Sequence, residues 1–163
     1  MAGNMRLREM QESDRDAVMR IFNHYAETSF AAYPDGPLPL PFFPHLKDGA
    51  LSAIVLEDDG GVAGFGILKS FLPFPAFRKT GMLTYFIAPA FTGRGLGTRL
   101  LGRLAEDAKK HGLTILVANL SSKNEASIRF HAKQGFIVTG SLIGVGEKFG
   151  EPFDVIWMQR PVE

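Results

Sequence analysis

The alternation of apolar and polar residues near the start of the chain predicts a strand followed by a helix. Residues 5–10 alternate as Met-Arg-Leu-Arg-Glu-Met, the period of two that is typical of a strand. Ser13 and Asp14 then supply side-chain oxygens that can cap a helix, ahead of apolar residues with helical spacing. Those apolar residues are Ala17, Val18, Ile21, Phe22 and Tyr25.

Proline and glycine divide the next part of the chain into strands and loops. Five prolines lie between residues 33 and 44, which predicts an irregular loop leading into a short helix before Gly49. We expect this loop to border a substrate pocket, although a plain linker has the same composition. Residues 51–57 and 62–71 predict two strands joined by an Asp-Asp-Gly-Gly hairpin turn, and a second proline-rich loop follows them.

The second half of the chain predicts alternating strands and helices. An apolar stripe with helical spacing follows a strand at residues 81–88 and ends at Gly112. The stripe consists of Leu96, Leu100, Leu101, Leu104, Ala105 and Ala108. The remaining predicted elements are a strand at residues 114–119, a helix at 125–134, and strands at 136–148 and 153–160. This order predicts a single α/β (α+β) domain over residues 1–163, with a mixed, largely antiparallel sheet and one central β-α-β crossover.

Composition narrows the possible functions. Hydrophobic residues make up 45% of the chain, enough for an ordinary globular core. The net charge of +1 leaves no overall positive field, so we expect no nucleic-acid partner. The absence of cysteine excludes disulfides and a cysteine nucleophile, and the four histidines match no zinc spacing, so we expect no metal. No apolar run is long enough to cross a membrane, and we expect a cytoplasmic protein with no membrane partner.

A glycine-rich turn between a predicted strand and the amphipathic helix is the strongest chemical signal. Gly93, Gly95 and Gly97 alternate there, so a ligand could approach the main chain closely. The unpaired N–H groups of the first helical turn, the helix dipole and Arg94 would together bind phosphate oxygens. The spacing matches neither the dinucleotide fingerprint nor the P-loop. A glycine-rich connection with no ligand is the alternative.

This turn resembles motif A of the GNAT acetyltransferases, Gln/Arg-x-x-Gly-x-Gly/Ala. Gly95 and Gly97 match its two glycines, whereas Thr92 stands where glutamine or arginine is usual. Residues 119–136 resemble the strand-to-helix element that follows motif A in the family. The residues in register there are Asn124, Ala126, Ser127, His131, Lys133, Gly135 and Phe136. Residues 21–25 and 145–159 are similar to the phosphinothricin and methionine sulfoximine N-acetyltransferase branch.

The resemblance implies an enzyme that moves the acetyl group of acetyl-coenzyme A directly to the primary amine of a small molecule, such as an amino acid or an analogue. It implies that main-chain groups of Tyr85, Phe86 and Ile87 bind the pantetheine arm, and that an N–H near Ile87 polarises the thioester carbonyl. Asn124 and Ser127 would lie near the thiol. The implied pyrophosphate site consists of Gly93, Arg94, Gly95, Leu96, Gly97 and Thr98.

The residues that would move protons are less defined. His131 stands where many relatives have a tyrosine that protonates the departing thiolate, but a structural histidine bonded to the backbone fits equally. The branch usually has a glutamate where this chain has Met82. The sequence therefore leaves the general base open. Candidate replacements are Glu27, Tyr33, Asp35, Tyr85 and a water relay.

The acceptor pocket and the quaternary structure also follow only from the resemblance. Arg78 would bind a substrate carboxylate, and Phe74 and Phe77 would line an apolar acceptor pocket, although a surface arginine and core phenylalanines are the plainer reading. Two other functions remain open, a protein N-terminal or lysine acetyltransferase and a non-catalytic acyl-coenzyme A sensor. The long apolar hairpin at the end of the chain favours a homodimer.

Overall fold

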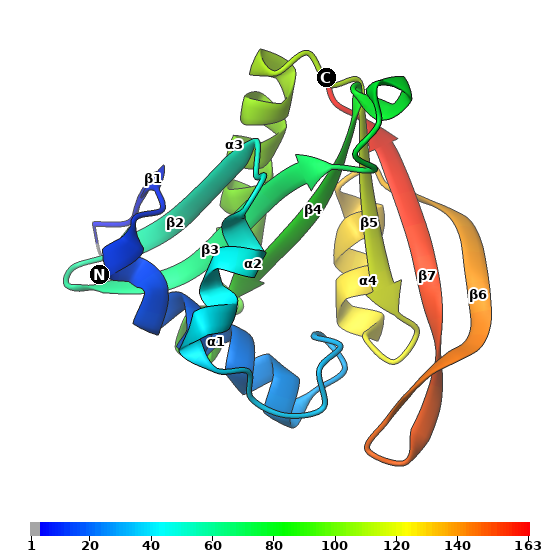
Figure 1. Cartoon of the computed structure of the whole chain (residues 1–163), viewed down its shortest axis with the longest axis horizontal. Coiled ribbons are helices and arrows are strands. Elements are labelled where there is room, and N and C mark those ends of the chain that lie inside the picture. Colours follow the sequence, from blue (N-terminus) through cyan, green and yellow to red (C-terminus); the bar gives the residue numbers. More distant parts are fainter. Residues whose placement is uncertain (1–3) are drawn as a thin grey trace.

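A seven-stranded sheet in the order β1-β2-β3-β4-β5-β7-β6 forms the centre of the computed structural model, which describes residues 4–163 (Figure 1). The first three residues of the predicted domain lie outside the described part. The strands are β1 (Arg6–Glu9), β2 (Ser52–Asp58), β3 (Gly61–Ser70), β4 (Thr80–Ile87), β5 (Ile115–Ser121), β6 (Ile137–Lys148) and β7 (Glu151–Pro161). All neighbouring strands are antiparallel except β4 and β5, which confirms the predicted mixed sheet and its β-α-β unit.

Helices cover both faces of this sheet (Figure 1). The helices are α1 (Arg15–Thr28), α2 (Phe43–Lys47), α3 (Leu96–Lys110) and α4 (Glu125–Lys133). Because successive strand residues point to opposite faces, Ile54 and Leu56 of β2 pack with the α3 side while Val55 packs with the α1 side. The two resulting apolar layers hold the sheet between α1 and α2 on one face and α3 and α4 on the other.

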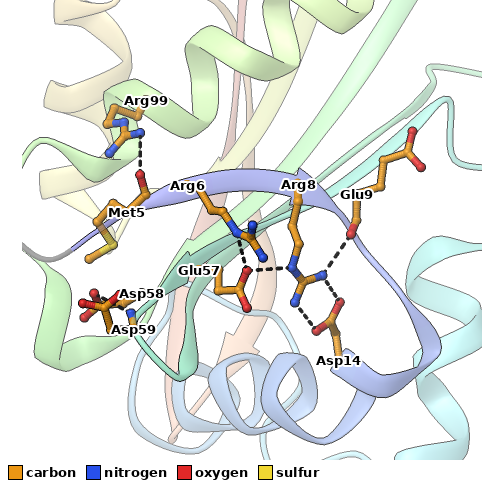
Figure 2. Close-up of polar contacts among 9 residues, drawn as sticks. All are labelled: Met5, Arg6, Arg8, Glu9, Asp14, Glu57, Asp58, Asp59 and Arg99. Atoms are coloured by element: carbon orange, nitrogen blue, oxygen red, sulfur yellow. Dashed lines mark hydrogen bonds and ion pairs between the residues drawn. The ribbon is translucent and has the colours of Figure 1, made fainter.

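The start of α1 differs from the sequence-based expectation in its chemistry. Asp14 precedes the helix, but its carboxylate makes no capping bond to it. The carboxylate instead accepts two bonds from the Arg8 guanidinium, at 2.8 and 2.9 Å (Figure 2). It also accepts one from the Gln11 N–H at 2.8 Å. Glu57 on β2 accepts from both Arg6 and Arg8. Asp14 therefore ties the chain before α1 to the edge of the sheet.

Two tight turns connect the hairpins. Gly60 lies in the β2–β3 turn with φ of 102°, a conformation open to glycine at little cost. Phe149 and Gly150 join β6 to β7 with φ values of 54° and 76°. The Phe149 ring meets Phe30 edge-to-face at 5.6 Å, so packing helps to hold a residue that would otherwise avoid this backbone conformation. β7 begins at Glu151, two residues before the predicted start.

The parallel pairing of β4 and β5 is short. Only Thr80, Gly81 and Met82 of β4 have partners on β5, although β4 continues to Ile87. Beyond Met82 the two strands separate, while each stays paired with its other neighbour, β3 or β7. The middle of the sheet therefore opens at the carboxyl end of β4.

Candidate active site

A cavity of about 770 Å³ occupies the opening between β4 and β5. Its walls come from both strands, from α1 and α2, from the first turn of α3 and from α4. Tyr33, Pro34 and Phe42 from the proline-rich segment also line it, so this loop borders the cavity as the sequence predicts. The cavity thus passes between the two strands and is lined by helices from both faces of the sheet.

The main chain of β4 presents polar groups to this opening. The Ala88 N–H donates to the Ala63 carbonyl at 2.7 Å, so Phe86 and Phe65 also form a hydrogen-bonded pair, because such pairs alternate along an antiparallel ladder. Ile87, between them, directs its N–H and C=O away from β3 and toward the opening. Phe86 thus contributes its ring to the cavity, while its main-chain groups face β3.

Tyr25 on α1 fixes one of these main-chain groups. Its hydroxyl donates a hydrogen bond to the Ile87 carbonyl, and its ring stacks on Phe86 with ring centroids 5.3 Å apart. Since the carbonyl is engaged, the Ile87 N–H is the group that remains directed at the cavity. Tyr85, two residues earlier on the strand, presents its main chain to the opening in the same way.

The first turn of α3 forms another wall. Gly93 and Gly95 have φ values of 78° and 73°, and Gly95 directly precedes the helix. This left-handed backbone strains any residue with a Cβ and turns the chain sharply into the helix. The N–H groups of Leu96, Gly97 and Thr98 begin the helix and lack partners within it, at the positive end of its dipole. The turn has the properties of an anion site.

The third glycine of the turn also lies in close contact with a neighbouring helix. A Cβ on Gly97 would lie 3.3 Å from the Phe130 ring on α4, a tight contact that favours glycine where the two helices pack. Thr92 donates from its hydroxyl to the Pro89 carbonyl and so shapes the turn. Arg94 places its guanidinium 5.2 Å from the centre of the Phe91 ring and does not line the cavity.

Helix α4 contributes a hydrogen-bonded pair that spans to β4. His131 is 3% exposed, and its Nε2 lies 2.7 Å from the Tyr85 hydroxyl. Its Nδ1 lies 2.7 Å from the Ser127 carbonyl oxygen. Asn124 begins the helix by accepting a bond from the Ser127 N–H at 3.4 Å, and all four residues line the cavity.

Burial determines the protonation of this pair. Desolvation lowers the pKa of His131, partly offset by the bond to the Ser127 carbonyl, so the imidazole is neutral at neutral pH. Burial raises the pKa of the Tyr85 phenol, and the charge of Arg160 opposes that shift. Because a carbonyl can only accept, Nδ1 carries the imidazole proton and Nε2 accepts from the Tyr85 O–H. This pair was not found from sequence, since nothing in the spacing relates β4 to α4.

The cavity wall on the α1 side is a second hydrogen-bonded group. The Tyr33 hydroxyl donates to Asn119 Oδ1 at 2.7 Å, and Asn119 Nδ2 lies 3.5 Å from the Met82 sulfur. Met82 therefore lies in the cavity wall and offers a thioether there, where the family resemblance had implied a carboxylate. The candidate bases Glu27 and Asp35 are exposed and do not line the cavity.

The predicted acceptor residues lie outside this cavity. Phe74 is 62% exposed, Phe77 packs against Phe71, and Arg78 donates to the Pro75 carbonyl on the 3₁₀ turn that follows β3. Their roles in acceptor binding stay predictions. Two further observations concern the described residues alone: no helix among them is long and apolar enough to span a bilayer, and no cluster of His, Cys, Asp or Glu in them could hold a metal ion.

Comparison with known proteins agrees with this architecture. Residues 18–136 match the model of the Acetyltransferase (GNAT) family, and the chain belongs to that family. It is 33% identical to the L-methionine sulfoximine/L-methionine sulfone acetyltransferase of Salmonella typhimurium, over 98% of this chain and 95% of that protein. It is 31% identical, over the same shares, to the L-amino acid N-acyltransferase MnaT of Escherichia coli. The predicted resemblance is confirmed.

A solved structure supports the same assignment. The fold matches the structure of yncA from Salmonella typhimurium with its cofactor acetyl-CoA, with a TM-score of 0.85 and 32% identity. The alignment covers 98% of this chain and 94% of that one. The chain therefore has the fold of an acetyltransferase over nearly its whole length.

Proposed function

We propose that this protein transfers the acetyl group of acetyl-coenzyme A to the primary amine of a small amino acid or amino-acid analogue. The observation that carries the proposal is the cavity between β4 and β5, which joins the anion-binding turn of α3 to the directed N–H of Ile87. Family membership and relatives that acetylate amino-acid derivatives support the same reaction.

The residues present fit acetyl-coenzyme A as a co-substrate. Its pyrophosphate would meet the amides of residues 93–98, where two glycines with positive φ turn the main chain into α3. The pantetheine arm would follow the unpaired edge of β4, where Tyr85 and Ile87 present main-chain groups. Asn124 and Ser127, at the start of α4, line the far end of this path and would lie near the thiol. Arg94 would add a contact from the surface.

The Ile87 N–H, which points into the cavity, would activate the thioester for attack by the amine. The Ile87 N–H would donate to the thioester carbonyl, and its bond strengthens as negative charge develops on that oxygen. The Tyr25 hydroxyl, by bonding the Ile87 carbonyl, fixes the peptide in this orientation in advance. Binding both substrates in one cavity lets the amine attack directly, without a covalent enzyme intermediate.

The acceptor side of the cavity supports an acceptor with an uncharged, apolar side chain. Its wall consists of aromatic and aliphatic groups with a few neutral polar ones, and among the described residues no Asp, Glu, Lys or Arg lines the cavity. A substrate carboxylate would meet the Tyr33 and Asn119 side chains at the mouth. A long peptide is a poorer fit, because the residues 31–34 cover that side.

A panel of acceptors tests the proposal. The protein is incubated with acetyl-coenzyme A and with methionine sulfone, methionine sulfoximine, phosphinothricin, leucine, phenylalanine, and phenethylamine, and free thiol and acetylated product are followed together. We expect product with one or more of the amino acids or analogues. Tight binding of acetyl-coenzyme A without any acetylated product would favour the alternative of an acyl-coenzyme A sensor.

We also propose that the chain is one domain and that it forms a homodimer. One sheet runs from Arg6 to Pro161, which supports a single domain. β6 is an edge strand with several exposed apolar side chains, and such an edge is usually covered by another chain. These side chains are Ile137, Val138, Leu142, Ile143 and Val145.

A further inference from the structure

We infer that the Tyr85 hydroxyl touches the reacting atoms and carries the proton from the attacking amine to the departing sulfur, with His131 as its proton acceptor. The inference rests on the proposed function and deepens it, because it names the groups that move the proton where Met82 replaces a carboxylate. Tyr85 is then the catalytic residue, and His131 acts through it.

Few titratable side chains line the cavity, and one of them bonds to a base. In the part of the chain that the structure describes, the titratable side chains that line the cavity are Tyr25, Tyr33, Tyr85 and His131. Tyr25 directs its proton to the Ile87 carbonyl, and Tyr33 directs its proton to Asn119 Oδ1. Neither of those acceptors is a base, so neither phenol can pass its proton onward. Tyr85 alone of the three bonds to a base.

Each hydrogen bond of the Tyr85–His131 pair has a fixed donor and acceptor. Nδ1 of His131 must donate to the Ser127 carbonyl, at 2.7 Å, which leaves Nε2 with a free lone pair for the Tyr85 O–H. The phenol oxygen keeps lone pairs to accept a proton from a substrate. The pair can therefore take up one proton, on Nε2, and release it by the same path.

Tyr85 also lies on the stretch of β4 that the acetyl-pantetheine arm would follow. Tyr85 lies two residues before Ile87 on the unpaired edge of β4, so both belong to the stretch that the thioester would follow. The Tyr85 side chain lies on the α4 face, within a 6.4 Å centroid distance of the Phe130 ring, which in turn packs on Gly97 of the anion-binding turn. The phenol is thus placed on the side of the sheet where the coenzyme would bind.

The proton moves in two transfers, first from the nitrogen to the Tyr85–His131 pair and then from the pair to the sulfur. An ammonium substrate first loses a proton to water, and the free amine forms the C–N bond by attack on the thioester carbon. The nitrogen then gives a proton to Tyr85 Oη while the phenol proton moves to His131 Nε2. When the C–S bond breaks and its electron pair leaves with sulfur, Tyr85 protonates the thiolate and recovers its proton from His131. Nitrogen and sulfur are bonded to the same carbon at this stage, so one hydroxyl serves both.

Single and double variants test this path. Tyr85→Phe removes the hydroxyl, and His131→Gln keeps an acceptor for the Tyr85 O–H but cannot take up a proton at neutral pH. We expect each to lower kcat by about 100-fold or more, the range of general acid–base catalysis, with the dissociation constant of acetyl-coenzyme A nearly unchanged. The double variant should be no slower than either single variant, because both act on one path. His111→Gln, at an exposed position after α3, is the matched control.

The pH profile separates proton transfer from a structural role. Protonation of His131 on acidification blocks Nε2, and burial lowers its pKa, so the acid limb of kcat should lie below the ordinary range of a histidine. The groups that face the pair are Ser127 from α4 and the charged Arg160 from β7. His131→Gln should lack this acid limb.

The outcomes are distinct. Product formation by the parent protein with Tyr85→Phe equally active would overturn the inference and leave the proposed function standing. Full activity of His131→Gln would likewise overturn it, because a hydrogen-bond acceptor alone would then suffice. A parent protein that forms no acetylated product would instead refute the proposed function itself.

Discussion

Lys148, at the end of β6, donates a hydrogen bond from Nζ to the Ala32 carbonyl at 2.6 Å, across 116 positions of the sequence. The lysine is 2% exposed, and desolvation lowers its pKa, opposed by the charge of Asp35. Its ammonium also lies 4.9 Å from the Phe149 ring. The bond attaches the segment that lines the cavity next to Tyr33 to the last hairpin of the sheet. A lysine on the last hairpin thereby helps to hold the cavity wall that we propose as the acceptor side.

Lys148→Met should loosen this wall while it preserves the apolar stem. We expect the KM for the acceptor to rise by about tenfold, equivalent to about 1.4 kcal/mol, with the KM for acetyl-coenzyme A nearly unchanged. Steady-state kinetics with each substrate varied in turn measures both constants. Lys110→Met, at an exposed position at the end of α3, is the control. An unchanged acceptor KM would show that the bond to Ala32 does not shape the site.

Asp14→Asn should destabilise the fold by about 2 kcal/mol at pH 7, because it breaks a nearly buried ion pair with Arg8 and leaves the guanidinium less well paired. The bonds from Arg8, partly opposed by burial, hold the pKa of Asp14 below its usual value. The carboxylate therefore stabilises the folded state above pH 3.8, and this contribution is lost as the pH falls through the folded-state pKa.

Urea denaturation at pH 7 and at pH 3 measures both parts of this prediction. The difference in unfolding free energy between the parent protein and Asp14→Asn should be largest at pH 7 and should narrow on acidification. Asp16→Asn removes a carboxylate that is 65% exposed and paired with Arg15, and should change stability by less than about 1 kcal/mol. A difference that stays constant with pH would contradict the assignment of the effect to the Asp14 charge.

Gly95→Ala should weaken the coenzyme site more than the fold. The left-handed backbone at Gly95 makes an alanine cost about 1 kcal/mol of stability, and relief of that strain would move the first amides of α3. We expect the KM for acetyl-coenzyme A to rise by about tenfold. Gly102→Ala, inside the same helix with open space around it, should instead stabilise the protein by about 0.5–1 kcal/mol and leave that KM unchanged. Equal effects of both variants on the KM for acetyl-coenzyme A would contradict the proposed coenzyme site at the start of α3.

Val145→Glu should disrupt the proposed homodimer, because it places a charge among the exposed apolar side chains of β6. Val145 is 58% exposed, so the substitution carries little cost for a single chain. We expect light scattering to report a dimer for the parent protein and a monomer for the variant. Leu72→Glu, which places the same charge at an exposed apolar position on the loop after β3, should remain a dimer. A parent protein that is monomeric at micromolar concentration would refute the dimer.

The sequence predicts those parts of the structure whose causes are local. The turn at residues 58–61, the helical stripe of α3 and the glycine turn before it each depend on neighbouring residues, and all three are present. The anion-binding turn could therefore be placed from sequence. However, a local pattern does not show why a residue is present when its main contact is with a residue far away in the sequence. The sequence predicts Asp14 as a helix cap, but its carboxylate bonds Arg8, and Gly97 lies in tight contact with the Phe130 ring.

The parts of the site that the sequence does not reveal depend on contacts across the sheet. The bonds from Tyr25 to Ile87 and from Tyr33 to Asn119 join residues 62 and 86 positions apart, and the packing of α1 and of the segment that follows it brings them together. Arg78, which matches the family pattern, lies outside the cavity, and its role in acceptor binding stays a prediction. The motifs thus predict the proposed coenzyme side of the cavity, whereas the proposed acceptor side depends on the tertiary fold.

The central claim is that the cavity between β4 and β5 binds acetyl-coenzyme A and an amino-acid-like amine together. The most direct measurement is a single reaction mixture of the protein, acetyl-coenzyme A and methionine sulfone, analysed by mass spectrometry for the N-acetylated product. The account predicts product that accumulates in equal amount to free coenzyme A and that falls at least about 100-fold with Tyr85→Phe. Release of free coenzyme A at the same rate with and without any amine, and with no acetylated product, would contradict it.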